Sequence, residues 1–338
     1  MKRLAALLTG ILALVVVFWP ASGRADCDTG NTGTTYTLAT LDTHPTFGNS
    51  IDKSGNNKYT FHCTLIIRPS DAVTMAAGST VAMDNGKLIN VFGDLTVNGT
   101  SGSWVTITSS SASPTRNIWG GILLQSGNGY ATITMNYARV LYGKIEVQNG
   151  SPTSRAYEMS ITNSYLYDGD LKANNIRSLT LSGTTVTENL GDGTPTTVNF
   201  DGSTLDAVSN NYFNTQATNC IDNVMPSRVH VLTGNSLNCN SSNRVEVDYT
   251  GNYTASTCVS GVSQAFMALS VTRTWSQRAT YVLNRDLCTA DGVGLTINTP
   301  GSGLFFGSTV NFETRGDLTL AGSSGSPFSI RSVSGTST

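Results

Sequence analysis

The sequence predicts an all-β fold, a parallel β-helix in which short strands coil around one core. Three observations lead to it: a repeat between two distant segments, a shorter period between them, and a composition poor in charge. Charged residues make up 12% of the chain, against about 25% in typical soluble proteins. Exposed helices would carry many Lys and Glu residues, so the low charge favours strands joined by tight turns. Beyond the N-terminal segment, no stretch keeps a 3.6-residue apolar period.

The distant repeat joins two segments that are copies of each other. Residues 93–107 (GDLTVNGTSGSWVTI) match residues 316–330 (GDLTLAGSSGSPFSI) at an offset of 223 residues. Just upstream, the letters GSTV stand at 78–81 and again at 307–310. Self-similarity of this kind is typical of repeat architectures, in which each unit stacks on its neighbour.

The shorter period lies between the two copies. Four segments, which begin at Ile133, Met159, Leu179 and Val198, share the pattern apolar, polar, apolar, small polar, any, small, any, apolar. The alternation predicts strands with one buried face. Because a single rung of this kind cannot cover its own apolar side chains, a repeated rung predicts a solenoid. We expect these four residues to stack on one another in the core.

Two further fragments, 229–231 and 245–248, have the same alternation and are predicted to be additional rungs. The alternative architecture is an antiparallel sandwich, which would prefer strands about 8–12 residues apart. The starts of the four aligned segments are 26, 20 and 19 residues apart. That spacing leaves room for two more short strands in each rung and favours the β-helix.

The N-terminal segment predicts export. Lys2 and Arg3 precede the apolar run Leu4–Trp19, and small residues lead to Ala25, after which we expect a signal peptidase to cleave. The apolar run is shorter than the roughly 20 residues that a spanning helix needs, so no membrane span is expected after cleavage. The expected location is extracellular or at the cell surface, with the periplasm as an alternative.

The charge of the mature chain argues against nucleic acid as a partner. Removal of residues 1–25 takes away Lys2, Arg3 and Arg24, which leaves 17 basic and 22 acidic residues and a net charge of −5. There is no basic block, whereas nucleic-acid binding depends on clustered Lys and Arg.

The cysteines predict disulfide bonds. An even number of cysteines in an exported chain reads as a disulfide framework, and six cysteines allow 15 pairings. When the two repeat copies are aligned, Cys27 and Cys63 precede the first copy as Cys258 and Cys288 precede the second. This alignment predicts that Cys27 pairs with Cys63 and Cys258 with Cys288, which leaves Cys220 to pair with Cys239.

The segment after the first repeat copy resembles a known module. Residues 91–111, followed by Ile118-Trp119-Gly120-Gly121-Ile122, are similar to modules of bacterial secreted right-handed β-helix repeat proteins, which have the pectin-lyase-like fold. In that family the Trp-Gly-Gly turn begins a rung after a serine-rich loop. The resemblance implies a right-handed parallel β-helix. It implies little about function, because the family includes surface, adhesive and carbohydrate-associated proteins as well as enzymes.

The resemblance covers residues 65–215 and, again, 281–338. With the signal peptide at 1–25, it predicts a first β-helix module at 26–215. Residues 216–338 would hold the continuation of the β-helix and the start of a second module. At the offset of 223 residues, the counterpart of Trp119 would fall beyond Thr338. The second module is therefore expected to be truncated, and the chain to be part of a longer protein.

The best candidates for chemistry are carboxylates one rung apart. Asp168 lies nine positions after Met159 and Glu188 nine after Leu179, so the two should stack on adjacent rungs, with Asp170 nearby. Such oxygens would suit calcium, and a carboxylate pair would suit a polysaccharide lyase or glycoside hydrolase. Ordinary turns have the same sequences as Asp168-Gly169-Asp170, and we expect turns here, no cofactor and no enzyme.

The tyrosines offer a binding alternative. Tyr137, Tyr157, Tyr165 and Tyr167 fall near one region, where their rings would stack on sugars. The sequence thus predicts an exported, non-enzymatic β-helix scaffold that acts at a surface, in adhesion or on carbohydrate, with a polysaccharide or a cell-surface molecule as partner. A polysaccharide-acting enzyme is the alternative.

Overall fold

The computed structural model describes residues 26–125, 130–148, 157–189, 195–240, 242–248 and 267–332. The predicted signal peptide and Cys258 lie outside these ranges. Within them, no helix has the length and apolar character needed to cross a membrane.

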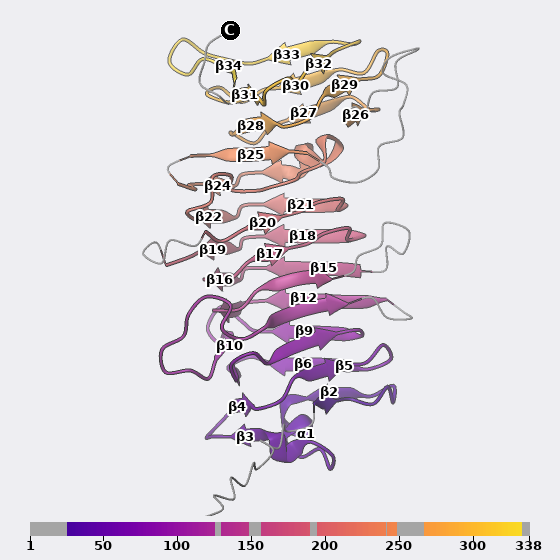
Figure 1. Ribbon diagram of the computed structural model, residues 1–338, viewed down its shortest axis with the longest axis vertical. Coiled ribbons are helices and arrows are strands. Elements are labelled where there is room, and N and C mark those ends of the chain that lie inside the picture. Colours follow the sequence, from indigo (N-terminus) through magenta and orange to yellow (C-terminus); the bar gives the residue numbers. More distant parts are fainter. Residues whose placement is uncertain are drawn as a thin grey trace, which may run out of the picture.

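Three long sheets make up the larger part of the described chain (Figure 1). Sheet A has seven strands in the order β1 (Cys27–Asp28), β5 (Leu65–Ile67), β8 (Leu88–Val91), β11 (Gly121–Gln125), β14 (Ile145–Gln148), β17 (Leu171–Lys172) and β20 (Val198–Asn199). Sheet B has eight, β2 (Thr35–Thr37), β6 (Ala72–Ala76), β9 (Asp94–Asn98), β12 (Ala131–Asn136), β15 (Tyr157–Thr162), β18 (Ser178–Ser182), β21 (Leu205–Ser209) and β23 (Leu232–Thr233).

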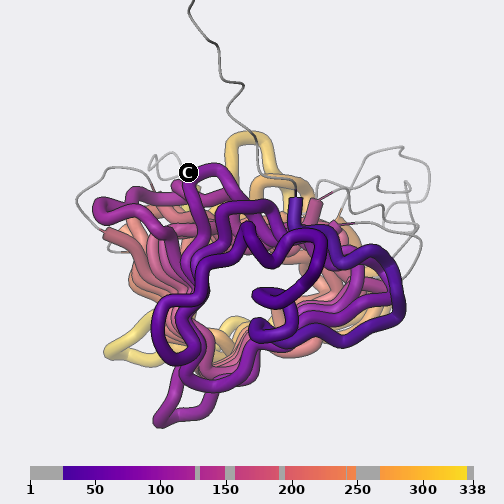
Figure 2. The backbone as a smooth tube through the Cα atoms, turned by 90° about the horizontal axis from the view of Figure 1, so that it is seen from below, coloured from indigo at the N-terminus to yellow at the C-terminus, as the bar shows by residue number. Residues whose placement is uncertain are grey.

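Sheet C has nine strands, β3 (Ile51–Lys53), β4 (Lys58–Phe61), β7 (Thr80–Met83), β10 (Val105–Ser109), β13 (Ala138–Leu141), β16 (Tyr165–Tyr167), β19 (Thr185–Thr187), β22 (Tyr212–Asn214) and β24 (Ser236–Leu237). Between residues 88 and 214 the chain adds one strand to sheet A, one to B and one to C in each circuit. Figure 2, a view along the stack, shows these circuits winding around the same interior.

The second group of strands continues the stack toward the C-terminal end. One of its sheets has four strands, β25 (Arg244–Val247), β28 (Thr280–Leu283), β31 (Gly303–Phe306) and β34 (Ser329–Ser332). A second has three, β26 (Met267–Leu269), β29 (Leu287–Thr289) and β32 (Phe312–Glu313). The third also has three, β27 (Arg273–Trp275), β30 (Leu295–Ile297) and β33 (Leu318–Leu320). A bridge between Ile221 and Val245 connects the two groups. One cluster of buried apolar side chains extends through both of them.

Parallel pairing dominates the fold. Among the named strands of the described chain, β3 and β4 form the one antiparallel pair, and every other pair is parallel. The predicted all-β class with stacked parallel strands is confirmed, and the antiparallel sandwich is excluded. Parallel strands need a crossover to return to the same sheet, and here the strands of the other two sheets provide it.

In the described ranges, short helices occur at two places. α1 (Leu38–Asp42) and the 3₁₀ helix η1 (Gly48–Ser50) pack at the N-terminal end of the stack, where Leu38 and Leu41 are buried. The side chain of Thr37 caps α1 by accepting a hydrogen bond from the N–H of Thr40. The second place is η2 (Pro226–Val231). The prediction of a rung at 229–231 was wrong, whereas the one at 245–248 is confirmed by β25.

The predicted core register is confirmed for three of the four aligned segments. Ile133 pairs with Met159, Met159 pairs with Leu179, and all three are buried. The fourth assignment was wrong, because Leu179 stacks on Leu205 and Val198 pairs with Leu171 in sheet A. Alternation gives the buried face of a strand but does not identify the sheet to which the strand belongs.

The Trp-Gly-Gly turn begins strand β11, as the resemblance implied. Trp119 is fully buried and its indole Nε1 donates to the carbonyl of Leu141 at 2.9 Å. A Cβ on Gly143, one rung along, would lie 2.2 Å from the indole ring, so the ring requires glycine there. Gly121 has a φ of +87°, which also favours glycine.

Two disulfide bonds close loops in the described chain. They join Cys27 to Cys63, with 5.7 Å between Cα atoms, and Cys220 to Cys239, with 5.2 Å. Both agree with the predicted pairs. Cys288 is also disulfide-bonded, and its predicted partner, Cys258, is outside the described residues. Disulfides persist in oxidising compartments, so these bonds are consistent with an exported protein.

Candidate functional site

The outer face of sheet C carries an arginine and a leucine on one rung and two tyrosines on the next. Strand alternation turns Ala138 and Val140 of β13 into the core, so Arg139 and Leu141 face outward. On β16 the same alternation buries Leu166 and turns Tyr165 and Tyr167 outward. Parallel register places Arg139 opposite Tyr165 and Leu141 opposite Tyr167. β16 therefore presents rings where β10 and β19 present threonines.

These outward residues line a hollow of about 470 Å³, whose walls are Trp104, Arg139, Leu141 and Tyr165. We call it the sheet C hollow. The guanidinium carbon of Arg139 lies 4.9 Å from the centre of the Trp104 ring, close enough for a cation–π contact. Burial raises the pKa of Tyr165, although the Arg139 charge opposes the rise. Its phenol therefore stays protonated and able to donate a hydrogen bond.

Further rings extend the aromatic surface around the hollow. Tyr137 meets Trp104 edge to face, with ring centres 5.5 Å apart. Tyr165 and Tyr167 are stacked at 6.1 Å with nearly parallel planes, and Tyr142 meets Tyr167 edge to face at 5.5 Å. Such contacts hold the rings in fixed orientations. The result is a rigid, half-exposed aromatic surface.

Three of the four predicted tyrosines lie at this surface. Tyr137, Tyr165 and Tyr167 are there, but Tyr157 is not, because it is the first inward residue of β15 and only 1% exposed. The prediction of Tyr157 as a binding residue is therefore wrong. Trp104 and Arg139 were not predicted as binding residues. The register of β10 with β13, which places Val105 beside Ala138, is the signal that would have grouped them.

The predicted carboxylates are held by a loop from a different rung. Residues 110–120 connect β10 to β11, and Arg116 in this loop reaches two carboxylates 54 and 72 residues later. It forms an ion pair with Asp170 and places Nη1 3.5 Å from Glu188 Oε2. Lys172 Nζ is 3.4 Å from the other oxygen of Asp170. Arg116 is 9% exposed and the Glu188 side chain 0%.

Backbone N–H groups complete the coordination of these carboxylates. Glu188 accepts from the N–H of Thr196 and from the N–H of Gln216. Asp170 accepts from the N–H of Thr197 at 2.9 Å. Burial opposes ionisation of Asp170, but the Thr197 N–H and the charges of Arg116 and Lys172 together hold its pKa below the ordinary value.

The predicted pair, Asp168 and Glu188, does stack on adjacent rungs. β16 and β19 are in register, and the N–H of Asp168 donates to the carbonyl of Thr187 at 2.9 Å. Both residues are buried, at 3% and 4% exposure. In the part of the chain that the structure describes, no group of three or more His, Cys, Asp or Glu side chains could hold a metal ion. The arrangement clamps the 110–120 loop to the stack.

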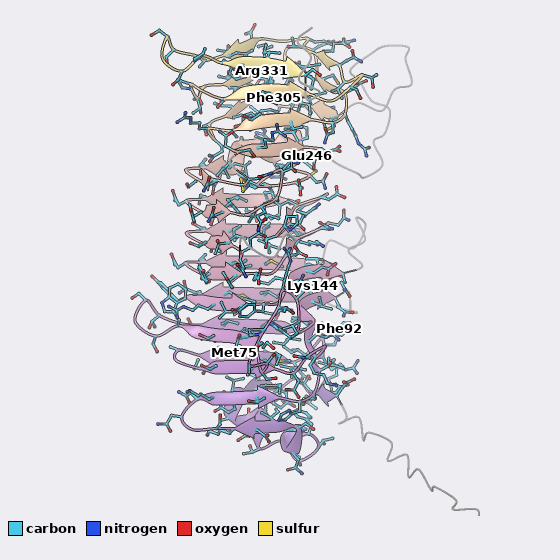
Figure 3. The ribbon with its side chains drawn as sticks, turned by 60° about the vertical axis from the view of Figure 1, so that its left-hand side comes forward. Met75, Phe92, Lys144, Glu246, Phe305 and Arg331 are labelled. Atoms are coloured by element: carbon cyan, nitrogen blue, oxygen red, sulfur yellow. A yellow bond between two sulfur atoms is a disulfide. The ribbon has the colours of Figure 1, made fainter. Side chains whose placement is uncertain are left out.

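A second carboxyl pair, which the sequence analysis missed, lies where the two strand groups meet. Bridges pair Asn199 with Asp222 and Ile221 with Val245, which places Glu246 one rung beyond Asp222. Glu246 pairs with Val282, which pairs with Phe305, and Phe305 pairs with Arg331; Figure 3 labels Glu246, Phe305 and Arg331. Burial, with the charges of Asp222 and Asp248, raises the pKa of Glu246 to about 7.

The two carboxyl groups of this second pair share a hydrogen bond, and burial raises the pKa of Asp222 as well. Asn219 donates to Asp222 at 2.9 Å, and Asn284 donates to Glu246. Glycoside hydrolases need their carboxyl groups about 5–9.5 Å apart to leave room for the sugar or a water. A hydrogen-bonded pair is too close for that work.

Comparisons with protein-family models, with curated proteins and with solved structures gave no match to this chain. The function proposed for the candidate site is therefore inferred from the geometry of its residues alone.

Proposed function

We propose that this chain is an exported, right-handed parallel β-helix of the pectin-lyase-like type whose sheet C hollow binds carbohydrate. The observation that carries the proposal is the rigid aromatic wall of the hollow. Tyr165 and Trp104 line the hollow together with Arg139, whose guanidinium lies over the Trp104 ring. A pyranose has an apolar face of C–H groups that packs on such rings and an edge of hydroxyls that needs polar partners.

The size and position of the hollow support binding of a polymer segment. Ligand pockets are typically about 300–1,000 Å³, and the hollow is about 470 Å³. It lies on the outer face of a sheet, so a chain that extends beyond one sugar would meet more sheet instead of a wall. The two disulfide bonds support the exported location of such a protein.

The contacts of the carboxylates favour a scaffold over an enzyme. A lyase or hydrolase at Asp168 and Glu188 is the alternative function. Glu188 already binds Arg116 and two backbone N–H groups, and its side chain is fully buried. A general acid or base must come within hydrogen-bond reach of its substrate, which this buried carboxylate would do only if the 110–120 loop moved away.

Affinity electrophoresis of the exported chain tests the proposal. Neutral β-glucan, galactan and polygalacturonate serve as probes. We expect Tyr165→Ala to weaken retardation by the bound polysaccharide about five- to tenfold, the value of one or two aromatic contacts. Tyr212→Ala is the matched control, because Tyr212 is an outward tyrosine on β22 of the same sheet and lies outside the hollow.

Two results would count against this function. The proposal would be wrong if none of the polysaccharides retarded the wild-type protein. It would also be wrong if Tyr165→Ala and Tyr212→Ala weakened retardation equally. Release of new reducing or unsaturated ends from a probe, lost in Glu188→Gln, would establish the enzyme alternative instead.

A further inference from the structure

The seam between η2 and β27 contains polar groups that the proposed carbohydrate site does not use. η2 packs against β26 and β27. On β27, Arg273 pairs with Leu295 and Trp275 with Ile297, and both partners are fully buried. Because residues two apart on a strand share a face, Arg273 and Trp275 both point toward the interior. An arginine thus occupies a position in an otherwise apolar column.

Among the residues that the structure describes, three buried polar atoms at this seam have no hydrogen-bond partner. They are Nε of Arg273, Nε1 of Trp275 and Nδ1 of His230, which lies on η2. Trp275 is 0% exposed. A buried donor that loses water without gaining a partner destabilises the folded state, and the penalty is larger when the donor is charged. An ion or a water that binds at this seam would satisfy such groups.

The charge at the seam is positive and uncompensated. The arginines that form ion pairs in the described ranges are Arg68, Arg116, Arg177, Arg285 and Arg315. Arg273 is not among them. Burial lowers the pKa of His230, and the charges of Arg273 and Arg228 lower it further, although a hydrogen bond with the Ser227 backbone opposes the shift. Two positively charged guanidinium groups, those of Arg273 and Arg228, therefore oppose protonation of the His230 ring.

We infer that the seam between η2 and β27 binds a small oxyanion, held by the guanidinium of Arg273 with the His230 ring and the Trp275 indole beside it. The planar guanidinium offers N–H donors in a fork that matches two oxygens of a sulfate, phosphate or carboxylate. Arg273 is only partly buried, so part of this residue is open to solution. The anion would neutralise the guanidinium and supply an acceptor to the donors that have none.

Calorimetric titration of the full chain with sodium sulfate tests this site, with chloride added to hold the ionic strength constant. We expect a saturable heat and a matching rise in melting temperature. Arg273→Gln should lose both, and Arg273→Lys should retain a weaker response, because ammonium keeps the charge without the fork. Arg278→Gln is the matched control, since Arg278 is exposed and lies five residues along the chain.

No saturable response in the wild-type protein would overturn the inference, whatever the variants do. So would an Arg273→Gln protein that folds and responds as the wild type does. A monosulfated disaccharide then identifies the source of the anion. If it displaces free sulfate, the bound group is a substituent of a sugar. If it does not, the ligand is the free ion, and both results keep the oxyanion site.

Discussion

The side-chain amide of Gln277 forms hydrogen bonds with the backbone of Asn235, 42 residues earlier, as a strand of the next rung would do. It accepts from the N–H of Asn235 at 2.9 Å and donates to its carbonyl at 2.8 Å. The side chain of Asn235 donates in turn to the carbonyl of Val208 at 2.7 Å and accepts from the N–H of Asn211 at 3.0 Å. This buried ladder of amides joins the second group of strands to the first.

Gln277→Ala should therefore destabilise the protein by about 2–4 kcal/mol. The substitution leaves the N–H and carbonyl of Asn235 buried without partners, and each unsatisfied group costs about 1–3 kcal/mol. Chemical denaturation with urea measures the change. Ser276→Ala, at the exposed neighbouring position, is the control and should change stability by less than about 0.5 kcal/mol. Equal effects of the two substitutions would show that the ladder contributes nothing.

A second prediction concerns the clamp on the 110–120 loop. Arg116→Met should cost about 3 kcal/mol, because it leaves the buried carboxylates of Asp170 and Glu188 without their shared cation. Arg177→Met is the control. Arg177 lies 3.9 Å from Glu158, and both side chains are about half exposed, so its loss should cost well under 1 kcal/mol. If the urea midpoints of Arg116→Met and Arg177→Met fell by the same amount, Arg116 would not hold the 110–120 loop to the stack.

The core of the stack was predictable where alternation and spacing acted together. Ile133, Met159 and Leu179 stack because each begins the same pattern on the same sheet. Val198 has that pattern too, yet it lies in sheet A. A circuit holds three strands of similar character, so a spacing near 20 residues fits a neighbour in the wrong sheet. The pair of Cys27 and Cys63 was predictable because both cysteines precede the first repeat copy, and Cys220 with Cys239 followed as the remaining pair.

The sites were less predictable because they depend on contacts between rungs. Nothing in the sequence near Arg116 indicates that its loop reaches Asp170 and Glu188, since that contact depends on the path of a loop without secondary structure. The pair of Asp222 and Glu246 was missed for the same reason. Its two members lie on either side of η2, where the rung period is interrupted.

A third prediction tests the packing behind the Trp-Gly-Gly turn. Gly143→Ala should destabilise the protein by about 3 kcal/mol, because the new methyl group would overlap the fully buried Trp119 ring. Gly102→Ala is the control, since a Cβ there meets nothing within 4 Å. Thermal unfolding followed by circular dichroism compares the two. A tolerated Gly143→Ala would mean that the indole has room to move.

The last prediction is a pH dependence that begins at Glu246. In the folded protein, burial and two neighbouring carboxylates raise the pKa of Glu246 to about 7 from an ordinary value of 4.5. The folded state thus holds a proton that the unfolded state releases between these pH values. The contribution of this group to stability is complete below pH 4.5 and is lost as the pH rises through about 7.

Glu246→Gln removes the ionisable group and keeps the shape of the side chain. The free energy of unfolding of this variant should therefore exceed that of the wild type by a margin that grows as the pH rises from 4.5 to 8. We expect a difference of about 1 kcal/mol at the upper end, after allowance for screening by solvent. Denaturation at several pH values in both proteins measures it, and subtraction cancels the other titrating groups. Glu158→Gln, at a half-exposed side chain, should follow the wild type. A constant difference across this range would mean that Glu246 ionises at an ordinary pH and that the carboxyl pair does not share its proton.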